Sequence, residues 1–145
     1  MNRFIVDINA DVGEGLSNES ELMPLISSCN IACGGHAGDD ETMKSVIELA
    51  KTHGVKIGAH PSFPDKDNFG RAPMKISYTA LFKSLEEQVC QLIKHLDDAH
   101  ESLHHIKPHG ALYNLATKDK NVATVIIELL KSFVFPVYLR RGCAP

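Results

Sequence analysis

One stretch decides the fold of this chain: Asn30-Ile31-Ala32-Cys33-Gly34-Gly35-His36-Ala37-Gly38-Asp39-Asp40. An apolar run ends here, glycines surround a single histidine, and a helix signal follows directly. The glycines allow the backbone to turn tightly and to approach a ligand closely. Asp39 suits the N-cap of a helix whose apolar residues recur at helical spacing as far as Gly54. We therefore expect His36 on the loop that leaves the C-terminal end of a strand, where ligands bind in α/β sheets.

Length and composition bound the class of protein. The chain has 145 residues and is 43% hydrophobic, which predicts one soluble domain over residues 1–145. A net charge of −3 gives no electrostatic reason to expect nucleic acid or an anionic membrane as partner. No apolar run reaches the roughly 20 residues of a membrane-spanning helix, and the N-terminus does not resemble a signal peptide. We expect a cytoplasmic protein whose Cys29 and Cys33 are buried free thiols.

Strand and helix signals alternate along the chain. The predicted strands cover residues 4–11, 28–33, 55–60, 105–109 and 135–139. The predicted helical segments are a short connector over residues 21–26, residues 40–53, a long segment capped by Ser77, and a segment capped by Asp119. Four strand–helix alternations and the start of a fifth strand predict a parallel α/β sheet with right-handed crossovers.

Polar residues recur where these strands end, and in a parallel barrel or doubly wound sheet they converge on one edge. The set comprises Asp7, Asn9, Asp11, His36, His60, Lys107 and His109. A long loop after the third strand adds Arg71, which could clamp a carboxylate or phosphate or be a solvated surface residue. His95, His100 and His104 are interpreted as surface residues, and His53 as a cation that suits a helix C-terminus.

An aspartate and three histidines from separate strands fit two kinds of chemistry. They could bind a divalent metal and activate water, or they could act as general acid and base while Lys107 stabilises negative charge. The residues alone leave both alternatives open. No P-loop and no G-x-G-x-x-G after a strand occurs, so nothing indicates autonomous nucleotide binding.

Four segments together resemble the LamB/YcsF family. They are Asp7–Gly15, Asn30–Asp39, Ile57–Ser62 with Phe69-Gly70-Arg71, and Lys107–Asn114, in that order along the chain. The resemblance implies an α/β fold, a seven-stranded, distorted parallel (β/α) barrel of the glycoside hydrolase/deacetylase type. It also implies ATP-driven ring opening of 5-oxo-L-proline (pyroglutamate) to L-glutamate by a multi-subunit 5-oxoprolinase. In that enzyme this chain would be the A component, and its partners would be the 5-oxoprolinase subunits B and C.

The resemblance also implies roles for single residues. The catalytic set is Asp11, His36, His60, Lys107 and His109. The substrate-binding set is Asp7, Asn9, Arg71 and Asn114. By analogy with the deacetylases of the superfamily, Asp11, His60 and His109 would hold a divalent metal, with His36 nearby.

The length departs from that pattern, because a complete barrel of this type needs roughly 250 residues. We therefore expect an incomplete barrel of about four to five β/α units, weakly stable alone or completed by self-association as a homo-oligomer. Two other functions are considered beside 5-oxoprolinase. One is a metal-dependent amidase or deacetylase that acts alone, and the other is an inactive binding chain that docks the companion subunits.

Overall fold

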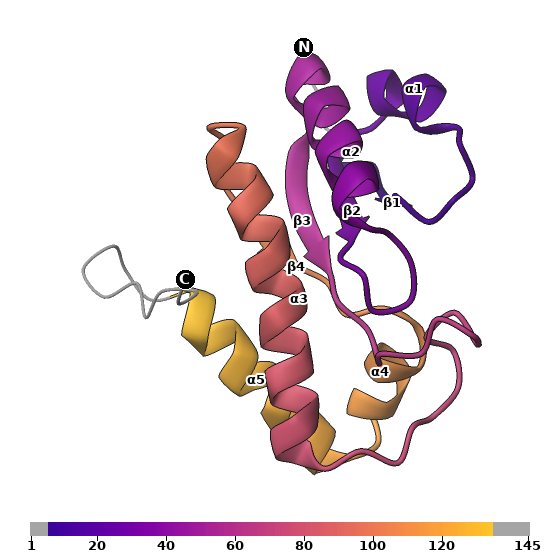
Figure 1. The fold of residues 1–145 in the computed structure, drawn as a ribbon, viewed down its shortest axis with the longest axis vertical. Coiled ribbons are helices and arrows are strands. Elements are labelled where there is room, and N and C mark those ends of the chain that lie inside the picture. Colours follow the sequence, from indigo (N-terminus) through magenta and orange to yellow (C-terminus); the bar gives the residue numbers. More distant parts are fainter. Residues whose placement is uncertain (1–5, 135–145) are drawn as a thin grey trace.

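The computed structural model of the chain describes residues 6–134. Within them, four parallel strands pair in the order β1-β2-β3-β4, and helices fill the connections (Figure 1). The strands are β1 (Asn9–Val12), β2 (Ser28–Ala32), β3 (Lys56–His60) and β4 (His105–Ile106). The helical elements are α1 (Glu19–Leu22), the 3-10 turn η1 (Met23–Leu25), α2 (Asp40–His53), α3 (Tyr78–Asp98), α4 (Gly110–Ala116) and α5 (Lys120–Val134). This open parallel β/α arrangement confirms the predicted fold class, an incomplete barrel.

The long helices begin and end where the sequence signals predict. The Asp39 side chain accepts a hydrogen bond from the backbone N–H of Thr42 at the start of α2. Gly54 ends α2 in the left-handed conformation with φ 65°, which glycine adopts without steric cost. Ser77 caps α3 through the backbone N–H of Ala80, and Asp119 accepts hydrogen bonds from the first turn of α5.

One face of the sheet carries the hydrophobic core. Figure 1 shows α2 and α3 along this face, and α5 packs against α3 on the side away from α2. Burying these apolar stripes is the main stabilising contribution to the fold. The largest fully buried apolar side chains are Phe63, Met23, Ile31, Met43, Ile47, Leu81, Leu85, Leu92, Leu96, Leu112 and Leu129.

The opposite face of the sheet is polar. In one row across the sheet, Asp11 pairs with Asn30, Asn30 with Gly58, and Gly58 with His105. Gly58 leaves the space that the His105 ring occupies, since a Cβ at this position would lie 2.3 Å from His105 Nε2. The small residue therefore permits His105 to reach Asn30, at 2.6 Å from Nε2 to Oδ1.

Several predicted boundaries differ from the structure. The first strand begins at Asn9, so Asp7 precedes it, and residues 4 and 5 lie outside the described residues. The fourth strand is only two residues long, because Pro61 at the end of β3 has no N–H to donate to the carbonyl of Lys107. The chain nevertheless follows β3, with hydrogen bonds from Lys107 N to Ala59 O and from His109 N to Pro61 O, both 2.9 Å.

Two further expectations concern the second half of the chain. Helix α4 begins at Gly110, where the sequence predicts an exit loop, because Gly110-Ala111-Leu112 turns Ala111 and Leu112 into the core. The predicted strand over 135–139 lies outside the described residues. No helix within residues 6–134 is long and apolar enough to cross a bilayer.

Candidate functional site

Three histidines and a glutamate meet at the C-terminal ends of the strands. Glu14 lies in the turn after β1, His36 in the loop after β2, His60 at the end of β3, and His109 just before α4. One potential ligand atom from each residue lies within 4.8 Å of all the others. These four residues are called the histidine cluster below.

The glutamate stands at the centre of the cluster. Glu14 Oε1 lies 2.9 Å from His36 Nε2, 3.4 Å from His109 Nδ1 and 3.7 Å from His60 Nε2. The three histidines are buried, whereas the Glu14 side chain keeps 14% of its surface exposed. The cluster is therefore reached from solvent on the glutamate side.

Backbone carbonyls fix the orientation of two of the rings. His60 Nδ1 lies 2.6 Å from Lys107 O, and His109 Nε2 lies 2.9 Å from Phe69 O. A carbonyl oxygen only accepts hydrogen bonds, so each of these nitrogens must carry a proton. The other nitrogens, His60 Nε2 and His109 Nδ1, face each other at 3.0 Å.

The third ring is held by stacking. His36 and His109 are parallel, with ring centroids 3.7 Å apart and an interplanar angle of 2°. Phe69 contacts both rings edge-on at 5.1 and 5.4 Å. His36 Nδ1 is buried without a hydrogen-bond partner among the described residues, so no backbone carbonyl there fixes the tautomer of this ring.

The loop between β2 and α2 places His36 through a close backbone approach. Gly38 has φ 82°, and a Cβ there would come within 2.5 Å of the Ala32 carbonyl oxygen. Gly34 N donates to Ala37 O at 2.8 Å and closes the loop. The glycines of the opening stretch therefore position the histidine between them, as predicted.

An ion pair lies directly beside the cluster. Lys107 Nζ is 2.6 Å from Asp11 Oδ1, and the other oxygen of Asp11 is 3.4 Å from His60 Nε2. Burial alone would raise the pKa of Asp11, but the interactions with His60 and Lys107 outweigh burial and hold the pKa well below its usual range. Asp11 is therefore a carboxylate at neutral pH, with a cation on one side and an imidazole on the other.

The cluster also shifts the ionisation of its own members. Burial alone would raise the pKa of Glu14, but hydrogen bonding to His36 and nearby imidazolium charge lower it. Burial and then the charge on His36 lower the pKa of His109. The arrangement thus favours an ionised glutamate beside a neutral His109.

A chain of side-chain hydrogen bonds holds the Asp11 carboxylate in place. Asn30 Nδ2 donates to Asp11 Oδ1 at 2.7 Å and also to Asn9 Oδ1. Asn9 Nδ2 donates to Ser28 Oγ at 2.8 Å, and Ser28 Oγ lies 3.4 Å from Asp7. Asn9 therefore acts through Asn30, and Asp7 lies further from the cluster.

The predicted site residues lie at different distances from the histidine cluster. It brings Asp11, His36, His60, Lys107 and His109 together. Arg71 is exposed and stacks over Phe69, with Cζ 5.1 Å from the ring centroid, so it lies at the border of the cluster. Asn114 is exposed on α4, and no hydrogen bond joins its side chain to the cluster in the described residues.

The metal-ligand set implied by the resemblance needs one correction. Among the described residues, the group that could hold a metal contains His60 and His109 as expected, but its carboxylate is Glu14. Asp11 is instead engaged by Lys107 and Asn30. A three-nitrogen, one-oxygen donor set fits a divalent transition metal such as zinc.

Glu14 is the residue that the sequence prediction missed. It belongs to the quoted Asp7–Gly15 segment, but its pattern indicates only a turn. The signal available is its place immediately after a strand end, flanked by Gly13 and Gly15. The prediction of His95 as a surface residue is also wrong: His95 is buried, and its Nε2 lies 2.9 Å from Asp40 Oδ1.

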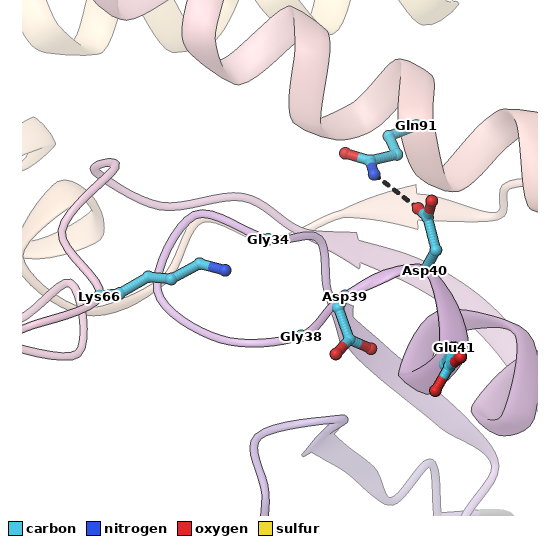
Figure 2. Close-up of a pocket in the computed structure, with 7 residues that line it drawn as sticks. All are labelled: Gly34, Gly38, Asp39, Asp40, Glu41, Lys66 and Gln91. Carbon is cyan, nitrogen blue, oxygen red and sulfur yellow. Dashed lines mark hydrogen bonds between the residues drawn. The ribbon is translucent and has the colours of Figure 1, made fainter.

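A separate hollow lies at the start of α2. Figure 2 shows Lys66 extending toward the loop that contains Gly34 and Gly38, and Gln91 bonded to Asp40. The cavity measures about 390 Å³. Helix capping accounts for Asp39, and the bonds to Gln91 and His95 account for Asp40, so we assign this hollow no role.

The parallel β/α units define a protein of the β/α-barrel class. Its candidate site is the group of histidines and carboxylates at the C-terminal ends of the strands. The chain belongs to the LamB/YcsF family, whose sequence model matches residues 6–140.

Curated relatives and a solved structure agree with this membership. The chain is 45% identical over 128 residues to the A subunits of 5-oxoprolinase from Haemophilus influenzae strains PittEE and PittGG. That match covers 88% of this chain and 52% of each relative. The crystal structure of the lactam utilization protein from Thermus thermophilus is similar, with a TM-score of 0.86 and 40% identity, covering 90% of this chain and 55% of that one. The chain therefore spans about half the length of the relatives it matches.

Proposed function

We propose that this chain carries the lactam-opening site of an ATP-dependent 5-oxoprolinase, which converts 5-oxo-L-proline to L-glutamate with companion subunits B and C. The observation that carries the proposal is the convergence of the histidine cluster with the Asp11–Lys107 pair on one sheet edge. The names of the similar proteins, a 5-oxoprolinase component and a lactam utilization protein, supply the substrate class.

The chemistry explains why such a site needs both a base and cations. A lactam is an unreactive amide, and phosphorylation of its oxygen by ATP turns the ring carbon into an electrophile that water can attack. The carbon–nitrogen bond then breaks, the nitrogen takes a proton, and phosphate is released. In this proposal the nucleotide is bound with the companion subunits.

Each residue beside the cluster has a role in this scheme. Asp11 or a cluster histidine accepts the proton of the attacking water. Lys107 and Arg71 neutralise the substrate carboxylate or the transferred phosphate. Asn9 holds Asn30, which in turn orients Asp11. Asp7 and Asn114 are more distant substrate contacts.

Companion subunits or a second copy of the chain would also cover the open sheet. In the described residues, β1 and β4 are the two edges, and the polar face between them carries no helix. Unpaired strand edges favour association with another chain. We therefore propose that the single domain functions within an assembly.

The proposal is tested by measuring glutamate release from 5-oxo-L-proline with the chain, both companion subunits and ATP, and by omitting each component in turn. We expect release only in the complete mixture, and binding of 5-oxo-L-proline that weakens in Lys107→Met. If neither release nor lactam binding occurs, the proposal is wrong.

A second candidate function is favoured by the donor set of the cluster. A divalent metal bound there would polarise an amide carbonyl, as in a metal-dependent amidase or deacetylase that needs no ATP. Hydrolysis of a lactam or an acetamide in the absence of both ATP and companion subunits would support this second function.

A further inference from the structure

The histidine cluster directs two imidazole lone pairs and a carboxylate toward one point. His60 and His109 each use their N–H on a backbone carbonyl, Lys107 O and Phe69 O respectively. The remaining lone pairs of His60 Nε2 and His109 Nδ1 face each other at 3.0 Å. Two acceptors at this distance repel unless a positive centre lies between them.

The same point is shared by further donors. Glu14 Oε1 lies 3.4 Å from His109 Nδ1 and 3.7 Å from His60 Nε2, and His36 Nε2 lies 2.9 Å from that oxygen. Two protons, one between His60 and His109 and one from His36 Nε2 to Glu14, could satisfy these four atoms in pairs. One divalent metal ion would satisfy all four at once.

The spacing of the four donors matches a tetrahedral site. Bonds of about 2.0–2.1 Å from zinc to nitrogen or oxygen place tetrahedral ligands about 3.4 Å apart. Four of the six separations within the cluster run from 2.9 to 3.7 Å and bracket that value, and all six are within 4.8 Å. Magnesium and calcium prefer sites built of oxygen, so this nitrogen-rich set selects a transition metal.

The surroundings of the cluster are those of a metal site as well. Histidines that ligate a metal usually donate their other N–H to a carbonyl or carboxylate, which fixes the ring and its tautomer. His60 and His109 do so, but His36 does not, since its Nδ1 has no partner among the described residues. His36 is therefore the least firmly oriented of the three imidazoles.

We propose that the cluster is a four-donor site for a divalent transition metal of the zinc class, with Glu14 rather than Asp11 as its carboxylate ligand. Asp11 stays outside the coordination sphere, because Lys107 and Asn30 already engage it. His60 and His109 are the principal ligands, and His36 contributes less to affinity. This proposal concerns metal binding alone and does not depend on lactam opening.

The test is direct metal binding by the 145-residue chain, measured without ATP, lactam or companion subunits. After removal of metal with a chelator, cobalt(II) is titrated and its visible absorption followed, and zinc is then added in competition. We expect one cobalt ion per chain with the intense visible band of tetrahedral coordination, and displacement of that ion by zinc.

Variants assign the ligands. We expect His60→Ala or His109→Ala to weaken zinc binding by at least a hundredfold, and Glu14→Gln by at least tenfold. His36→Ala should weaken it less than His60→Ala does. Asp11→Asn should change the affinity less than tenfold, and His53→Ala, on the exposed end of α2, should leave it unchanged.

Circular dichroism of each variant separates lost binding from lost folding. If an alanine variant unfolds, Glu14→Gln keeps the test decisive, since that side chain is partly exposed and its size is conserved. The proposal is overturned if the wild-type chain binds neither cobalt nor zinc. It is equally overturned if His60→Ala and His109→Ala bind as tightly as wild type, or if affinity depends on Asp11 and not on Glu14.

Discussion

His60 Nε2 and His109 Nδ1 lie 3.0 Å apart, while the opposite nitrogen of each ring faces a backbone carbonyl oxygen. The two residues are 49 positions apart in the chain, and strand β3 and the segment after β4 bring them together. The geometry fixes opposite tautomers on the two rings. His60 carries its proton on Nδ1, and His109 carries its proton on Nε2.

Nitrogen-15 NMR of the metal-free chain at neutral pH tests these tautomers. We expect the shifts of His60 to report a protonated Nδ1 and those of His109 a protonated Nε2, because each N–H donates to a carbonyl. His53, exposed at the end of α2, is the control and should show the mixture of tautomers typical of solvent. Reversed assignments for His60 and His109 would contradict these hydrogen bonds.

The two thiols of β2 and its exit should be unreactive. Burial raises the pKa of Cys29 and of Cys33 to about 12, so the thiolate is scarce at pH 8. We expect iodoacetamide to leave both residues unmodified in the native chain and to alkylate both in urea, as measured by peptide mass spectrometry. Rapid native alkylation of Cys33 would show that the loop around His36 opens.

Gly58→Ala should disturb the row across the polar face. The Cβ of the new alanine would lie 2.3 Å from His105 Nε2, so the His105 ring must move and break its contact with Asn30. We expect a loss of about 1–3 kcal/mol in the free energy of unfolding, measured with urea. In a His105→Ala background the same change should cost clearly less, and equal costs in both backgrounds would exclude a clash with this ring.

Asp40 should contribute to stability at neutral pH and lose that contribution in acid. Hydrogen bonds from His95 and then Gln91 lower its pKa in the folded chain. A lowered folded-state pKa adds stability above the unfolded value, about 3.9, and the added stability disappears as the pH falls through the folded value. The free energy of unfolding of Asp40→Asn should therefore fall less than that of wild type between pH 5 and pH 3.

The matched control for this prediction is Asp67→Asn, at an exposed loop position. Its unfolding free energy should follow the pH dependence of wild type. If the free energy of unfolding has the same pH dependence in Asp40→Asn as in wild type, the bond between Asp40 and His95 contributes no pH-dependent stability.

Sequence reasoning predicts the elements whose signals are local. Helix α2 is an example, because Asp39, the apolar spacing and Gly54 all act within the helix itself. The end of β3 at His60 is likewise predictable, since Pro61 cannot continue a ladder. The burial of His95 is predictable in principle, because it follows Leu92 by three positions on the apolar stripe of α3.

The features that escape prediction depend on contacts between distant segments. Glu14 sits on a turn without periodicity, and only the completed sheet brings it to His36, 22 residues away. Glu14 rather than Asp11 is the carboxylate of the cluster because Asp11 forms an ion pair with Lys107, which lies 96 residues away in the chain. The brevity of β4 and the start of α4 likewise follow from packing against β3 and the core.

The proposed place of lactam opening is the histidine cluster at the sheet edge, and a paired activity measurement tests this assignment. Glutamate formation from 5-oxo-L-proline and ATP is compared for wild type, His109→Ala and His53→Ala, each combined with both companion subunits. We expect His53→Ala to match wild type and His109→Ala to lose at least about a hundredfold in rate, because His109 serves the site either as a general base or as a metal ligand. A folded His109→Ala that forms glutamate at the wild-type rate would contradict the account.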